Sequence, residues 1–148
     1  MKKLAILAVF VFTLILSMNA FAAKWELVDT VKDSGLEIKV LVDTESIRKG
    51  TESKKFPKYN RSDGFSAIVK FDMKIEDNEK KMHQVEATNL YSFYEEKGVR
   101  KYTILESYDK NGKIAESDEK DISTDNVDAK DSGKEFPIIW EFIQKKLK

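Results

Sequence analysis

The sequence predicts an α+β domain: an antiparallel β-sheet of about six strands with one C-terminal helix packed on one face, after an N-terminal signal peptide. Apolar residues alternate with period two from Lys24 to about Lys120, which is typical of half-buried strands. The apolar spacing changes to that of a helix from about Phe136 to Lys148. The first 22 residues have the pattern of a secretion signal.

The expected signal peptide spans residues 1–22 and is of a bacterial type. Two lysines follow the first methionine, an almost wholly apolar run covers residues 4–16, and small residues at positions 20 and 22 predict cleavage between Ala22 and Ala23. The alternative is a retained membrane anchor, but the apolar run is shorter than the ~20 residues that cross a bilayer. We therefore expect one exported domain, residues 23–148.

The composition excludes several classes of protein. The chain contains no cysteine, so neither a lipid anchor at the cleavage site nor a disulfide is expected. Residues 23–148 hold 24 basic and 26 acidic residues, a net charge of −2 that gives no drive toward nucleic acid. No further long apolar segment follows residue 18, so we expect no transmembrane span after cleavage.

The first half of the domain is expected to hold two strands and a loop. Trp25, Leu27 and Val31 should share one face of the first strand, and the second strand should cover residues 38–42 after a turn at Gly35. Residues 43–46 read as a break with one helical turn, and residues 48–65 read as a loop because they lack a sustained apolar pattern.

The second half should complete the sheet and add the helix. Alternation predicts strands at about 65–75, 82–94, 100–108 and 113–118, of which the last two are joined by a tight turn at Asn111-Gly112. Residues 119–134 look polar and irregular. In the terminal helix, the apolar positions recur at helical spacing and lysines follow in the last turn: Ile139, Trp140, Phe142, Ile143, Leu147, Lys145, Lys146 and Lys148.

Residues suited to catalysis or metal binding are few. His83 is the only histidine and is expected to be structural or exposed, since no nucleophile elbow accompanies it. A hydrolase would need a cleft that groups acids such as Glu86, Glu106 and Asp109. The acidic loop residues Asp125, Asp128 and Asp131, with Gly133, lack the spacing of a calcium loop. We expect no metal, no cofactor and no enzymatic activity.

A basic stretch at residues 48–61 is the main candidate binding site. It contains six basic residues and one acid, a local charge of +5, with two aromatic residues between the cations. The alternative is a solvated loop whose charge offsets residues 116–131, which carry seven acids and two lysines. The candidate binding residues are Lys54, Lys55, Phe56, Lys58, Tyr59 and Arg61.

The order of several short motifs resembles the surface-adhesin protein E family of bacteria. The motifs are the tryptophan at Trp25, the segment Leu41 to Ile47, Asn89-Leu90-Tyr91, the strand 100–105 and the hairpin 107–114. The resemblance implies an antiparallel sheet with a C-terminal helix, exposure at the cell surface or in the periplasm, and adhesion to host proteins. It implies no catalytic residues. The cysteines that commonly tether helix to sheet in that family are absent here.

We therefore expect an exported, non-enzymatic, adhesin-like binding protein that recognises a protein or an anionic polymer outside the cytoplasm. One alternative is a periplasmic structural or maintenance protein of the envelope without a host ligand, and another is an uncharacterised hydrolase. The expected location is extracytoplasmic: periplasmic, secreted or associated with the cell surface. A homodimer is compatible with the sequence.

Overall fold

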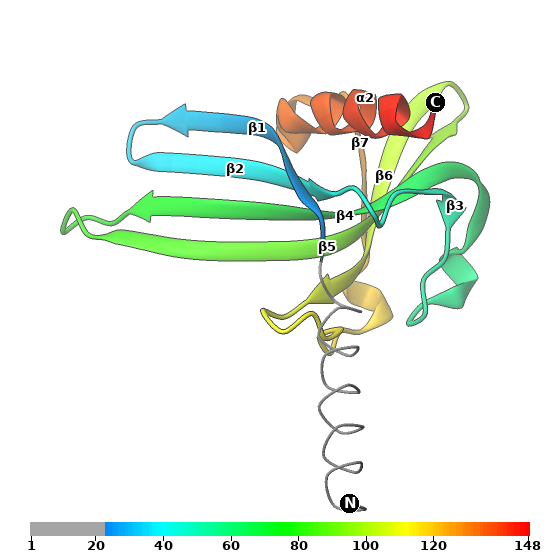
Figure 1. The fold of residues 1–148 in the computed structure, drawn as a ribbon, viewed down its shortest axis with the longest axis horizontal. Helices are drawn as coiled ribbons and strands as arrows, with labels where there is room; N and C mark the ends of the chain where they lie inside the picture. The colour runs from blue at the N-terminus through cyan, green and yellow to red at the C-terminus, as the bar shows by residue number, and fades with distance from the viewer. Residues whose placement is uncertain (1–22) are drawn as a thin grey trace, which may run out of the picture.

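A computed structural model describes residues 23–148 as a curved antiparallel sheet with one helix across it (Figure 1). The expected signal peptide, with Ala22 on one side of the predicted cleavage point, lies outside the described residues. The described residues form seven strands and one α-helix: β1 (Trp25–Asp33), β2 (Leu36–Asp43), β3 (Arg48–Thr51), β4 (Arg61–Glu76), β5 (Met82–Glu96), β6 (Val99–Tyr108), β7 (Ser123–Asn126) and α2 (Glu135–Leu147).

The sheet is organised around β4, a strand of 16 residues. Its second half pairs with β2, and its first half pairs with the short β3, so both lie along the same edge of β4. Its other edge pairs with β5 from Phe65 to Glu76, and β6 and β7 follow, which gives the order β1-β2-β4-β5-β6-β7. Residues 23–148 also contain three short 3₁₀ turns, Pro57–Tyr59, Glu119–Asp121 and Lys130–Ser132.

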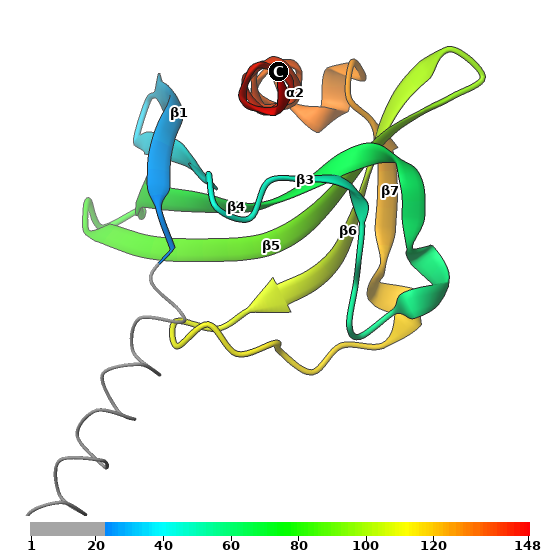
Figure 2. The same cartoon turned by 45° about the vertical axis from the view of Figure 1, so that its right-hand side comes forward.

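Helix α2 covers one face of the sheet and forms the main core with it (Figure 2). Its buried residues are Phe136, Ile139, Trp140 and Ile143. Phe142 and Leu147, which the predicted stripe also includes, are half-buried and pack against the core. The Phe136 ring stacks on Tyr102 at a centroid distance of 4.1 Å, and Trp140 meets Phe65 edge-on at 4.7 Å. Each such buried side chain contributes about 1.5–3 kcal/mol. The predicted sheet with a C-terminal helix on one face is therefore confirmed.

The predicted face of the first strand is wrong, because β1 contains a β-bulge. Its pairing with β2 shifts between Leu27 and Asp29, so Val28 is an extra residue and the alternation reverses there. Val28 packs against the core, whereas Leu27 is 54% exposed. Trp25 lies on the face away from the helix, where the Lys70 ammonium is 4.1 Å from its ring centroid.

Residues 48–65 are not one long loop. Arg48–Thr51 form β3, and β4 begins at Arg61, which leaves only residues 52–60 as a connecting loop. The residues of β3 and the first residues of β4 are polar, so apolar alternation could not reveal these two strand segments. Gly64 allows β4 to continue here: its φ is +68°, and a Cβ at this position would lie 2.1 Å from the carbonyl oxygen of Phe93.

Two further expectations fail near the C-terminal part of the sheet. Residues 113–118 do not form a strand; only a single bridge joins Ile114 to Tyr108 after the predicted Asn111-Gly112 turn. The last strand is β7, within the segment expected to be irregular, and all four of its residues are exposed. A polar edge strand has no apolar face to produce alternation.

The break after β2 also differs from the expectation of one helical turn. Residues 43–46 form a simple turn, in which the Ser46 amide donates a hydrogen bond to the Asp43 carbonyl oxygen.

A second bulge changes the face of β6. Tyr91 pairs with Ile104 and Leu90 pairs with Glu106, so Leu105 is an extra residue on β6. Tyr102 and Ile104 face the helix, whereas Glu106 and Tyr108 point to the opposite face of the sheet. The sequence spacing of Tyr102, Ile104 and Tyr108 would place all three on one face, and the bulge moves Tyr108 to the other. We call the face of the sheet opposite α2 the far face.

Candidate functional site

The loop 52–60 folds back over the far face of the sheet (Figure 2). The segment that follows β6 runs beside this loop near Ala115. At the start of the loop, the Thr51 hydroxyl lies 2.7 Å from the Ser92 hydroxyl of β5, and both residues are buried. This hydrogen bond attaches the end of β3 to the middle of the sheet. Leu90 and Leu105, which are buried but lie outside the main core, supply apolar surface on the same face.

Glu106 is the anchor of this loop. Its Oε1 accepts hydrogen bonds from the Ser53 hydroxyl at 2.7 Å and from the backbone amides of Lys54 at 2.9 Å and Lys55 at 3.1 Å. Its Oε2 accepts one from the Tyr108 hydroxyl at 2.6 Å. The residue is only 3% exposed, so its carboxylate is satisfied by the protein itself.

The electrostatics of this anchor follow from its hydrogen bonds. Burial alone would raise the pKa of Glu106, but the hydrogen bonds from Tyr108, Ser53 and the two amides outweigh burial and hold that pKa below its usual value. The pKa of Tyr108 is raised, first by burial and then by its hydrogen bond to the Glu106 carboxylate. The carboxylate is therefore ionised at neutral pH and holds the loop in one position.

Two of the cations in the loop contact the acidic segment that follows β6. Lys58 forms an ion pair with Glu119, and the Tyr59 hydroxyl donates to the same carboxylate at 3.2 Å. The Lys55 ammonium donates to the carbonyl oxygen of Ala115 at 2.8 Å. Part of the basic charge is thus balanced within the chain.

The aromatic residues of the loop lie beside its cations. The Phe56 and Tyr59 rings meet edge-on at 6.5 Å, with the Lys55 ammonium 5.7 Å from the first ring and the Lys58 ammonium 5.5 Å from the second. Lys54 is exposed, and within residues 23–148 its ammonium has no ion-pair partner. The loop therefore presents charge and apolar surface together.

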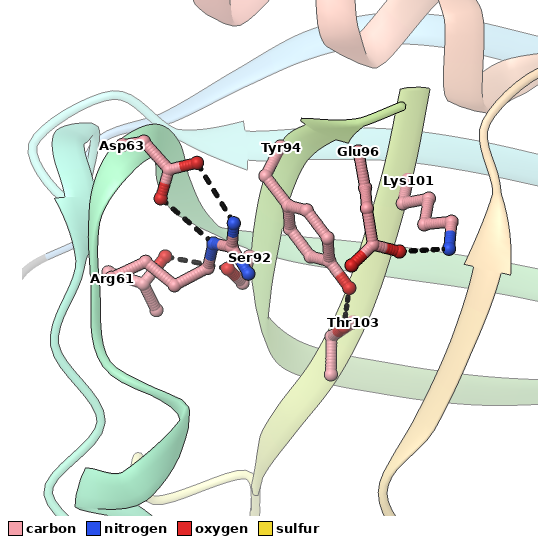
Figure 3. A network of polar contacts seen from close by, with 8 residues as sticks. Arg61, Asp63, Ser92, Tyr94, Glu96, Lys101 and Thr103 are labelled. Carbon is pink, nitrogen blue, oxygen red and sulfur yellow. Dashed lines mark hydrogen bonds and ion pairs between the residues drawn. The ribbon is translucent and has the colours of Figure 1, made fainter. Parts of the chain in front are cut away.

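Arg61, the first residue of β4, extends the basic surface onto the sheet (Figure 3). Its guanidinium lies 4.0 Å from the centre of the Tyr94 ring and makes two hydrogen bonds to Asp63, at 3.0 and 2.9 Å. The Tyr94 hydroxyl lies 3.2 Å from the Thr103 hydroxyl, which fixes the ring in place. Arg61 is thereby held over an aromatic ring by its two bonds to Asp63.

A pocket of about 150 Å³ lies between the loop and the sheet. Half of its lining residues come from the end of the loop and the start of β4, and half come from β5 and β6. They are Lys58, Tyr59, Asn60, Arg61, Ser92, Tyr94, Thr103 and Leu105.

The structure thus brings three predicted binding residues, Lys58, Tyr59 and Arg61, to one pocket. Lys54, Lys55 and Phe56 lie at the anchored end of the loop instead. The sequence did not reveal Glu106 as the anchor of the loop. Regular alternation along residues 100–108 would place its side chain on the helix side of the sheet, so the pattern holds no signal for this role.

The acids considered for a hydrolase are not grouped around this pocket. Glu106 is buried as the loop anchor. One carboxylate oxygen of Asp109 accepts hydrogen bonds within a turn, from the backbone amide of Asn111 at 2.8 Å and from that of Lys113 at 3.0 Å. Glu86 is exposed on β5. His83 lies near the turn between β4 and β5, with its Nε2 2.7 Å from the Asp77 carboxylate. Asp109 and His83 thus make the contacts of turns, and Glu106 makes those of the loop anchor.

The acidic loop is tied to the sheet and the helix. Arg100 holds Asp128 with two hydrogen bonds, at 2.9 and 2.5 Å, and lowers the pKa of that carboxyl. In residues 23–148 no group of three or more histidine, cysteine, aspartate or glutamate side chains is arranged to hold a metal ion. Over the same residues, no helix is both long and apolar enough to span a bilayer.

Comparison with known proteins gives no match: no family model, no curated protein and no solved structure is similar to this chain. The resemblance to the surface-adhesin protein E family therefore stays a prediction.

Proposed function

We propose that this chain is an exported, non-enzymatic, adhesin-like binding protein whose loop 52–60 and adjoining Arg61 recognise an anionic polymer or a protein partner outside the cytoplasm. The observation that supports this proposal most is the anchoring of the loop by Glu106. A loop that is already ordered loses little conformational entropy on binding, so its contacts contribute more fully to affinity.

The chemistry of the surface suits an anionic partner. Lys54, Lys58 and Arg61 supply positive charge, which attracts a polyanion at long range and falls in effect as salt screens it. The rings of Tyr59 and Tyr94 lie beside two of these cations and offer apolar contact to the parts of a partner between its charged groups. The pocket between them is large enough for a side chain or a small charged group.

A structural role in the cell envelope, without a host ligand, is the second candidate. The ion pairs of Lys58 with Glu119 and of Arg61 with Asp63 favour it, because part of the basic charge already serves contacts within the chain. The two candidates differ in whether an external polyanion competes for these cations.

The test is binding of two labelled probes, a heparin oligosaccharide and poly-L-glutamate, at low and at physiological salt. The variant replaces three loop lysines with glutamine, and a control variant replaces three exposed lysines elsewhere with glutamine. The loop set is Lys54, Lys55 and Lys58, and the control set is Lys74, Lys110 and Lys130. We expect binding to be lost only with the loop set; equal binding by both variants would remove this surface as the site.

Export and location need separate measurements. Fractionation of the producing cell with N-terminal sequencing should give a mature chain that begins at Ala23. Protease treatment of intact cells then separates the locations, because a surface protein is cleaved and a periplasmic one is protected. An intact leader in the cytosol would contradict the proposal.

A further inference from the structure

The chain places one of its own acidic segments on the basic surface. After β6, residues 114–121 run past the loop, and the Glu119 carboxylate meets the Lys58 ammonium and the Tyr59 hydroxyl. Four residues earlier, the carbonyl oxygen of Ala115 accepts a hydrogen bond from the Lys55 ammonium at 2.8 Å. The surface thus binds a backbone carbonyl and a side-chain carboxylate of one polypeptide segment.

The middle of this segment is held weakly. Its start is fixed to β6, where the Ala115 amide donates to the Ser107 carbonyl at 2.7 Å, and its end leads into β7, which pairs with β6 from Ser123. Between these points, the described hydrogen bonds of residues 116–121 are local ones between Asp118 and Asp121, apart from those of Glu119. Side chains in the Lys58–Glu119 pair are 61% and 51% exposed, so water and salt compete with it.

We propose that the partner of this surface is an acidic polypeptide segment, and that residues 116–121 occupy Lys58 and Tyr59 through Glu119 until such a segment displaces them. This inference rests on the proposed function and narrows it. A polypeptide fits better than a sulfated glycan because Lys55 is bound by a peptide carbonyl and Tyr59 by a carboxylate. The internal segment therefore serves as a model of the external one.

Competition between Glu119 and an external segment for Lys58 predicts the direction in which a variant should change affinity. A tethered segment acts at a high effective concentration, so it lowers the apparent affinity for any external segment that uses Lys58. Glu119→Gln weakens the internal contact and leaves Lys58 intact. Because an exposed ion pair contributes little, we expect this variant to bind poly-L-glutamate about two- to fivefold more tightly than the unchanged protein.

The control for charge is Glu76→Gln. It changes the net charge by the same amount, but Glu76 is exposed at the opposite end of β4 from the loop. A general electrostatic effect would raise the affinity of both variants equally. The full mature chain is used for each variant, and thermal unfolding confirms that each one is folded.

Hydrogen exchange supplies a second readout. The amides of Asp121 and Ile122 donate to Asp118 and Glu119 within the segment. We expect added poly-L-glutamate to increase exchange at these two amides, because the displaced segment loses its turn.

The outcomes separate this inference from the proposed function. Tighter binding by Glu119→Gln alone, with faster exchange, supports the inference. Equal affinities for Glu119→Gln and Glu76→Gln, or binding of heparin without poly-L-glutamate, overturns it and leaves a basic surface for other anions. Failure of every variant to bind either probe overturns the inference and the proposed function together.

Discussion

The Glu106 carboxylate lies 2.7 Å from the Ser53 hydroxyl, although the two residues are 53 positions apart in the chain. This contact joins the connecting loop between β3 and β4 to the centre of the far face. It makes a surface loop part of the folded structure, so the loop can be tested by stability measurements as well as by binding.

Replacing Glu106 with alanine should destabilise the protein strongly. The change leaves the Ser53 hydroxyl, two backbone amides and the Tyr108 hydroxyl without their acceptor, and we expect a loss of about 2–4 kcal/mol in the free energy of unfolding. Urea unfolding measures it. The control is Glu86→Ala on the exposed part of β5, which should change stability by less than about 0.5 kcal/mol.

The contribution of Glu106 should depend on pH. Its pKa is lower in the folded protein than its ordinary value of 4.5, so its stabilising effect is complete above that value and is lost as pH falls through the folded pKa. The stability difference between the unchanged protein and Glu106→Gln should therefore be constant near neutral pH and shrink in acid. Unfolding curves at a series of pH values test this, and a difference that grows in acid would contradict it.

The stack of Phe136 on Tyr102 should be a main attachment of the helix. Phe136→Ala removes a buried ring and leaves a cavity beside Tyr102, and we expect a loss of about 3–5 kcal/mol. Ile138 is 41% exposed on the same helix, so Ile138→Ala should cost far less. Thermal and urea unfolding of both variants measure the difference, and similar losses would mean that the helix is held elsewhere.

Gly64 should tolerate no side chain. Both a positive φ and the carbonyl oxygen of Phe93 oppose a Cβ there, whereas Gly98 has φ +78° with nothing within 4 Å of its Cβ position. Gly98→Ala should therefore lower the free energy of unfolding by about 1 kcal/mol, because only the positive φ is unfavourable for alanine. Gly64→Ala should lower it clearly more, because a steric clash is added. Equal losses in urea unfolding would show that β4 shifts to make room.

The fold class could be predicted from sequence because its core residues follow simple periods. Ala67, Val69 and Phe71 alternate along β4, and Ile139 and Ile143 recur on one side of α2. The bulges could not be predicted, since an extra residue leaves composition and polarity unchanged while it reverses every later side chain. The strands β3 and β7 were missed because they are polar and stabilised by backbone pairing.

The candidate site could be predicted only in its charged part. Lys58, Tyr59 and Arg61 are visible as a basic, aromatic stretch, and they do meet at one pocket. Glu106 could not be assigned to the site, because the regular spacing of Tyr102, Ile104 and Tyr108 in the sequence hides the bulge at Leu105 and places Glu106 on the helix side. Tyr94 reads as a core aromatic, and its role beneath Arg61 depends on the pairing of β5 with β6.

The extra residue at Leu105 makes β6 sensitive to changes in length rather than in composition. Deleting one residue there would restore regular pleating and rotate the Glu106 carboxylate into the aromatic interior beneath the helix. The chain would then lose its loop attachment and gain an unpaired charge in its core at the same time. Natural variants of this protein should therefore vary in sequence along β6 while keeping the number of residues between Tyr102 and Glu106.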